Sequence, residues 1–175
     1  MNKCLGYNEL SKKLPKSIKR IFDKSRREHN ILKSDDYVNM FESSKICNRG
    51  FPVAQNNGDI LIYDIYNKRF CGFNHESKRC IYGKDLYKKF TQFVELASID
   101  YDHNKIPTDK QLLVIENALK IKYKVPFKAE YDKKYRTIYV NPVPRSDKDI
   151  LKILSFIDWN YLKSAKRIIK KVFLR

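Results

Sequence analysis

The run CGFNHESKRC contains the first residues whose types and spacing could do chemistry. Cys71, His75 and Cys80 are spaced C-x3-H-x4-C, and Cys47 could complete four ligands of the kind that zinc accepts. The C-x2-C pair that is typical of structural zinc sites is missing. Buried structural cysteines and a surface histidine would explain the same residues. Zinc binding by these four residues therefore stays open, and we assign no metal and no cofactor.

A second group of residues is acidic. Glu95 is followed by Asp100, Asp102 and His103, and carboxylates with a histidine could hold Mg²⁺ for phosphodiester cleavage. A solvated acidic loop explains the same stretch. The chain has five glycines, none of them in a G-x-x-x-x-G-K or G-x-G-x-x-G arrangement that would cradle a nucleotide. A metal-dependent nuclease is thus an alternative only; we assign no catalytic residue and favour a protein that is not an enzyme.

Charge is the strongest functional signal in the sequence. The chain carries 37 Lys and Arg against 20 Asp and Glu, a net charge of +17. Such a surplus costs self-repulsion in a compact protein, and the usual compensation is a polyanionic partner. A genome that favours Lys codons would raise the Lys content as well, but it would not explain why residues 1–30 and 151–175 each contribute +6.

Both ends of the chain are predicted to form basic amphipathic helices. In the segment 7–29, Leu10, Leu14, Ile18 and Phe22 recur at helical spacing, and Pro15 is expected to start the main helix. In the last segment, Trp159, Leu162, Ala165, Ile169, Val172 and Phe173 form the apolar side. The cations that we predict to contact phosphates are Lys16, Lys19, Arg20, Arg26, Arg27, Lys163, Lys166, Arg167, Lys170 and Lys171. A solvated lysine face is the structural alternative for each helix, and an anionic membrane surface is a third interpretation.

Two hairpins are predicted between the terminal helices. The first runs from Asp59 through a turn at Asn67 and Lys68 to Phe73, with a third strand near Arg79–Tyr82. The second pairs FKAEYD with YRTIYV. Tyrosines and basic residues interleave in both, a pattern that suits half-buried strands and that single-strand binders also use to stack on bases.

Further helices complete the predicted fold. Helices are expected over 35–47, around Leu86–Ala97, from Thr108 with capping-box spacing to Gln111, and from Ser146 with Asp149 three residues on. Leu112, Ile115 and Leu119 should form the buried face of the helix after Thr108, and the stretch SIDYDHNKIP before it reads as a loop. We therefore predict one α+β domain over residues 1–175, with two β-hairpins and about five or six helices.

Cysteine usage and hydropathy indicate the compartment. Four scattered cysteines lack the density of a disulfide scaffold, so we expect reduced thiols. No apolar run reaches the length of a signal peptide's core or of a transmembrane helix. We expect a cytoplasmic protein. If a virus encodes it, the compartment would be the cytoplasm of the host.

Residues 107–121 carry one resemblance. The run Pro107-Thr108-Asp109-Lys110-Gln111-Leu112, with Ile115 one turn on and Ser146-Asp147-Lys148-Asp149 opening a later helix, resembles a T-x-K-Q-L-x-x-I helical module of phage- and plasmid-encoded proteins, including some anti-CRISPR-like inhibitors. The resemblance implies a viral or mobile-element origin and transfers no catalytic residue.

These observations favour a non-catalytic protein that binds RNA or DNA, alone or within a ribonucleoprotein, through its terminal helices. One alternative is an anti-CRISPR-type inhibitor that occupies the RNA or the nucleic-acid channel of a host ribonucleoprotein effector. The sequence does not distinguish RNA from DNA or single from double strands, and it does not give the oligomeric state.

Overall fold

The computed structural model describes residues 3–28, 40–42, 44–94, 98–101 and 104–173, apart from the side chains of residues 28 and 159. Its elements, in chain order, are α1 Tyr7–Lys12, α2 Lys16–Glu28, β1 Gly50–Asn56, β2 Asp59–Asp64, β3 Arg69–Asn74, β4 Arg79–Ile81, α4 Gly83–Lys88, the 3-10 helix η1 Phe90–Gln92, β5 Ser98–Asp100, α5 Asp109–Tyr123, β6 Phe127–Asp132, β7 Thr137–Pro142, α6 Asp147–Phe156 and α7 Trp159–Phe173.

Two antiparallel sheets and six α-helices make up the described fold, which confirms the α+β prediction. The first sheet has the strand order β1-β2-β3-β4 and the second the order β5-β7-β6. Both predicted hairpins are present as β2–β3 and β6–β7. Each hairpin belongs to a sheet with more strands than predicted. The strands β1 and β4 flank the first hairpin, and β5 pairs with β7 of the second.

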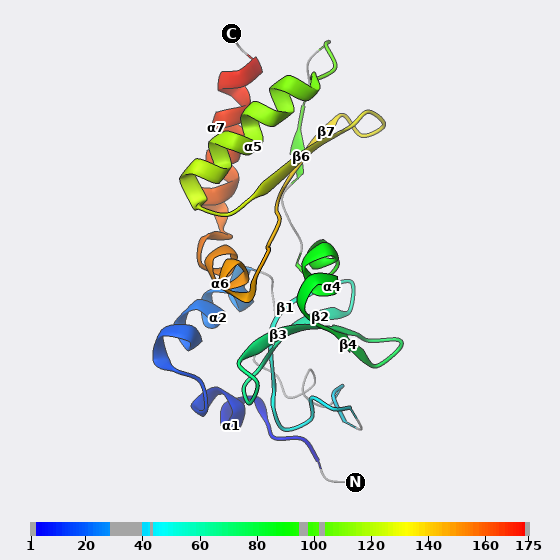
Figure 1. Cartoon of the computed structure of the whole chain (residues 1–175), viewed down its shortest axis with the longest axis vertical. Coiled ribbons are helices and arrows are strands. Elements are labelled where there is room, and N and C mark those ends of the chain that lie inside the picture. Colours follow the sequence, from blue (N-terminus) through cyan, green and yellow to red (C-terminus); the bar gives the residue numbers. More distant parts are fainter. Residues whose placement is uncertain (1–2, 29–39, 43, 95–97, 102–103, 174–175) are drawn as a thin grey trace.

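The two sheets lie in opposite halves of an elongated molecule (Figure 1). The half that contains the N-terminus holds the four-stranded sheet with α1, α2 and α4, and the half that contains the C-terminus holds the three-stranded sheet with α5 and α7. Aromatic side chains fill the first sheet's interfaces: Phe22 of α2 packs on Phe51 and Phe70, and Phe41 packs edge-on against Phe73 from the other face.

Helix α6 lies between the halves, and its first residue joins them. The Asp147 carboxylate accepts a hydrogen bond from the backbone N–H of Phe70 on β3, at 3.1 Å, and another from the Tyr87 hydroxyl of α4, at 2.7 Å. One carboxylate thus ties the start of α6 to two elements of the four-stranded half. Burial is the first cause, and the bond to Asp147 the second, of a Tyr87 pKa raised to about 12.

Several predicted helices differ in extent. The N-terminal segment is two helices, with a break at residues 13–15. The helix expected over Leu86–Ala97 ends at Lys88, continues as η1 and leaves residues 95–97 outside the described residues. Of the helix expected over 35–47, residues 35–39 and 43 are not described, and the rest form turns.

Candidate nucleic-acid interface

Five cations of α7 form an exposed row. Lys163, Lys166, Arg167, Lys170 and Lys171 are all exposed, and α7 contains no Asp or Glu. None of the ion pairs between described residues involves any of the five. At about 1.5 Å of rise per residue, Lys163 and Lys171 lie about 12 Å apart along the helix axis. The row is therefore a continuous cationic strip in which each helical turn supplies at least one cation.

The opposite side of α7 is anchored in the protein core. Tyr161, Ala165 and Ile169 are buried, and the Tyr161 hydroxyl donates to the carbonyl of Val140 on β7 at 2.7 Å. Burial raises the pKa of Tyr161, so this hydroxyl stays a donor at any physiological pH. A rigid backbone beneath the cations reduces the entropy lost when a polyanion binds them.

A second contact holds α7 against its neighbour. Lys122 of α5 donates from Nζ to the Ser164 hydroxyl oxygen of α7 at 2.7 Å. Figure 1 shows α5 and α7 on the same side of the three-stranded sheet. Lys122 is itself exposed, so its charge adds to the cationic surface beside the α7 row.

Helix α2 supplies fewer cations than predicted. Lys16, Arg20 and Arg27 are exposed and recur on one side of the helix. Lys19 forms an ion pair with Asp23 at 3.0 Å, one turn along the same helix. Three exposed cations therefore remain on α2 without a carboxylate partner among the described residues.

Arg26 is a correction, because it lies in the core and is not a surface contact. Its side chain is 1% exposed, its guanidinium stacks 4.5 Å from the centroid of the Tyr7 ring, and its Nη1 donates to the Pro52 carbonyl at 2.7 Å. In α2 it follows Phe22 by four residues, which places both on the buried face. Burial raises the pKa of Tyr7 to about 12, while the positive charge of Arg26 acts in the opposite direction.

The two basic helices are connected through the residues that precede α7. Lys24 of α2 donates to the Ser155 carbonyl and to Asp158 Oδ2, both at 2.9 Å. Asp158 Oδ1 accepts from the Tyr161 N–H at 3.0 Å and so caps the first turn of α7. Burial acts to raise the pKa of Asp158, but the hydrogen bonds from Lys24 and from the backbone outweigh it, and the pKa lies below its ordinary value.

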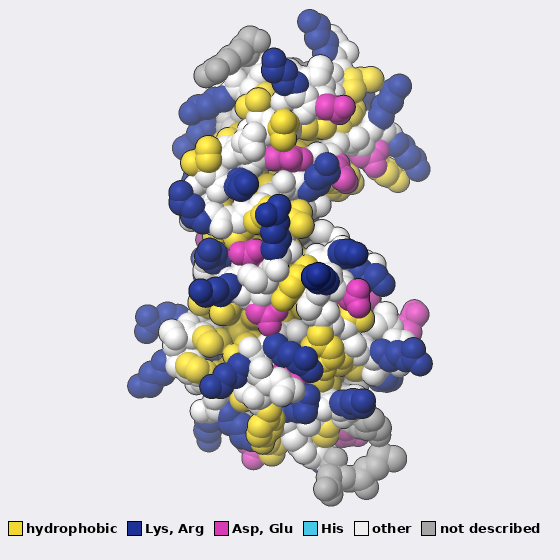
Figure 2. Space-filling view, viewed as in Figure 1, with side chains coloured by type: hydrophobic (Ala, Val, Ile, Leu, Met, Phe, Trp, Pro, Cys, Tyr) yellow, Lys and Arg dark blue, Asp and Glu magenta, His cyan; other side chains and the backbone are white. Residues whose placement is uncertain are grey.

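The surplus charge is not restricted to the terminal helices. Figure 2 shows Lys and Arg side chains over the whole of the face in view, in both halves of the molecule, with far fewer Asp and Glu side chains. The two terminal helices are therefore part of a broadly cationic surface. What distinguishes α7 is its row of cations without any acidic residue in the helix.

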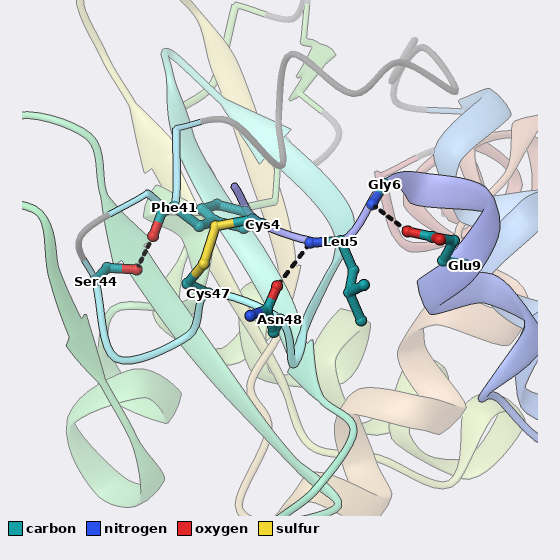
Figure 3. Close-up of a disulfide and its surroundings, with 8 residues drawn as sticks. All are labelled: Cys4, Leu5, Gly6, Glu9, Phe41, Ser44, Cys47 and Asn48. Carbon is teal, nitrogen blue, oxygen red and sulfur yellow. Dashed lines mark hydrogen bonds between the residues drawn. A yellow bond between two sulfur atoms is a disulfide. The ribbon is translucent and has the colours of Figure 1, made fainter. Parts of the chain in front are cut away.

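The four residues considered for zinc are not gathered into one site. Cys47 forms a disulfide with Cys4, so the expectation of four reduced thiols is wrong for these two (Figure 3). His75 Nδ1 lies 3.0 Å from Asp59 Oδ1. Cys71 and Cys80 are free thiols on neighbouring strands. Among the residues that the structure describes, no group of three or more His, Cys, Asp and Glu side chains could hold a metal ion.

The acidic candidate site is only partly described. Asp100 lies at the end of β5 and is exposed, whereas Glu95, Asp102 and His103 lie outside the described residues. The strand β5 was itself expected to be a loop. It is held by pairing with β7, including Ile99 opposite Ile138.

Most strand tyrosines are used in packing. Tyr63 is buried against Phe70, so its ring is not presented to bases, and the half-buried Tyr131 packs edge-on against Tyr101. Among the described residues, the exposed tyrosines are Tyr66 and Tyr135, which lie in the turns that follow β2 and β6. Both turns were predicted, but Tyr66 and Tyr135 were assigned to the flanking strands, which are shorter than expected.

No helix of the described residues is both long and apolar enough to cross a membrane.

Similarity to known proteins assigns no family to this chain. No protein-family model, curated protein or solved structure matches this chain significantly.

Proposed function

We propose that this protein binds nucleic acid through the cationic row of α7, with Lys16, Arg20 and Arg27 of α2 as further phosphate contacts. One observation carries the proposal: five exposed Lys and Arg side chains on a single anchored helix that has no acidic residue. Phosphate contacts of this kind give affinity and orientation without reading base sequence. The partner is therefore expected to be bound with little sequence preference.

Counterion release gives the proposal a quantitative signature. A protein that neutralises phosphates with Lys and Arg loses affinity as salt rises, with a slope of about −0.7 to −0.9 per contact in a plot of log K against log salt. The five contacts on α7 alone predict a slope of roughly −4, and the three further contacts on α2 would steepen it to about −6 to −7. Fluorescence anisotropy with labelled RNA and DNA oligonucleotides of mixed sequence, single- and double-stranded, measures this slope and identifies the preferred polymer.

The decisive variant reverses three charges of the row. Lys166→Glu, Arg167→Glu and Lys170→Glu together should lower affinity at least tenfold and flatten the salt slope. The matched control is Lys84→Glu, Lys88→Glu and Lys89→Glu, which changes the net charge equally on exposed residues in and beside α4. Equal losses in the two triple variants would mean that net charge alone drives binding and that α7 is no interface. Affinity that does not change with salt would also remove the proposal.

A further inference from the structure

Helix α5 exposes apolar side chains on the face that points away from the core. Of the seven large hydrophobic residues that are exposed in the described structure, three lie on α5: Leu113, Val114 and Ile121, with exposed fractions of 53%, 48% and 70%. A fourth, Ile106, lies just before the helix. Among the side chains that the structure describes, no other helix exposes a large hydrophobic group, and grouped apolar side chains, unlike single ones, mark interaction sites.

These residues form one stripe. Leu113, Asn117 and Ile121 follow one another at four-residue spacing, and Val114 lies seven residues before Ile121, so all four share one side of the helix over about 12 Å. The other side of α5 is the one that packs, through the buried Ile115 and Leu119. The helix is therefore apolar on both sides, and its outward stripe contributes little to the protein's own core.

Cations border the stripe. Lys110 and Lys120 are exposed on the same side of α5, and the exposed Lys124 follows at its C-terminal end. At its C-terminal end the stripe borders a surface groove of about 720 Å³, lined by Asn117, Lys120, Ile121, Lys124, Val125, Pro126, Arg145 and Asp149. The Asp149 carboxylate already accepts the Arg145 backbone N–H at 2.9 Å. Over α5, Figure 2 shows separate hydrophobic side chains with Lys and Arg around them.

We propose that the outward face of α5 and this groove form a docking surface for an acidic amphipathic helix of a partner protein. Apolar residues of that helix, spaced three or four apart, would pack on Leu113, Val114 and Ile121. Its carboxylates would face Lys110, Lys120, Lys124 and Arg145, and charge complementarity of this kind selects the partner and speeds association. The surface is separate from the α7 row, so the inference does not rest on the proposed nucleic-acid function.

Other occupants fit the surface less well. A second copy of this chain would carry the same charge of +17 and, in a two-fold interface, would place one copy's lysines near those of the other. A nucleic acid fits less well, because its phosphates gain no binding free energy from aliphatic side chains. A membrane surface favours a broad apolar face rich in aromatic residues, whereas this stripe has three aliphatic side chains and ends in a groove.

The test uses two fluorescein-labelled peptides of identical Leu and Glu composition. One places its leucines on a single helical face, and the other scatters them. Because both carry the same charge, general attraction to a basic protein cancels in the comparison. We expect the full-length protein to bind the amphipathic peptide at least tenfold tighter than the scrambled one. In NMR spectra, the amide chemical shifts that change on peptide binding should belong mainly to residues 109–126 and 145–149.

Two variants locate the site. Leu113→Ser with Ile121→Ser should abolish the difference between the peptides, while Tyr66→Ser with Tyr135→Ser, which removes equally exposed hydrophobic groups elsewhere, should preserve it. The proposal is overturned if both peptides bind alike, or if the Leu113 and Ile121 variant keeps the preference. Self-association of the wild type that the Leu113 and Ile121 variant abolishes, measured by sedimentation, would also overturn it. So would a variant that binds phosphatidylglycerol vesicles less well than the wild type does but binds the amphipathic peptide equally well.

Discussion

Lys24 and Asp158 lie 134 residues apart in the sequence, yet the Lys24 ammonium is 2.9 Å from the Asp158 carboxylate. Because Asp158 also caps α7, this pair connects the first basic helix to the start of the last one. The orientation of the proposed interface thus depends on a contact between the two ends of the chain.

Removing the cap should loosen α7. We expect Asp158→Ala to lower the free energy of unfolding by about 1–2 kcal/mol, since it removes the N-cap oxygen and leaves Lys24 without its carboxylate. Urea denaturation measures the change. The exposed Lys163→Ala, one turn into the same helix, is the control and should stay within about 0.5 kcal/mol of the wild type. Equal effects of the two substitutions would show that the cap contributes nothing.

The same carboxylate predicts a pH dependence. The pKa of Asp158 is lowered in the folded protein, so its contribution to stability is present above the unfolded value of about 3.9 and is lost as the pH falls through the folded pKa. The stability difference between the wild type and Asp158→Asn should therefore shrink below about pH 4. A difference that stays constant from neutral pH to pH 3 would contradict the assignment.

Arg26 and Arg27 are adjacent in sequence, but their substitution should affect different properties: stability for Arg26 and nucleic-acid binding for Arg27. Arg26→Ala removes a buried guanidinium that stacks on Tyr7 and leaves the Pro52 carbonyl without this donor, so we expect a loss of about 3 kcal/mol in stability. Arg27→Ala, on the exposed side, should cost under about 0.5 kcal/mol and should weaken nucleic-acid binding. Chemical denaturation and anisotropy, applied to both variants, separate the two roles.

Local signals in the sequence account for much of the fold. Thr108 and Gln111 form the predicted capping box of α5, and Ser146 caps α6 by accepting from the Asp149 N–H. These motifs are visible because both partners lie within four residues. The position of Arg26 could also have been predicted, because it follows Phe22 by one helical turn on the apolar side.

Other features depend on contacts that are distant in sequence. The strand β1 contains Pro52 and lacks alternation, because the five residues from Gly50 to Ala54 are all buried, with α1 and α2 in contact with the strand. The three-residue β5 exists through pairing with β7, nearly 40 residues later. The choice of Cys47 as the partner of Cys4 has no sequence signal, because four cysteines allow several pairings.

The disulfide should contribute strongly to stability. Cys4 and Cys47 are 43 residues apart, and the chain-entropy model gives about 4 kcal/mol for closing a loop of that length. The double variant Cys4→Ser and Cys47→Ser, and wild type treated with reductant, should lose a comparable amount in urea denaturation. The variant Cys71→Ala and Cys80→Ala lacks the free thiols but keeps the disulfide, so it is the control and should remain as sensitive to reductant as the wild type. If reductant does not change the stability of the wild type, the stabilising role of the Cys4–Cys47 disulfide is contradicted.

Gly72 on β3 gives the sharpest test of packing in the four-stranded sheet. A Cβ at this position would lie 2.3 Å from Cζ of Phe93, a side chain that is itself buried. Gly72→Ala should therefore force Phe93 out of place and cost about 2–3 kcal/mol. Phe93→Leu removes the clashing ring atoms, so the alanine should cost less in that background than in the wild type. A double-mutant cycle by urea denaturation measures this coupling, and strictly additive effects would show that the ring does not pack on Gly72.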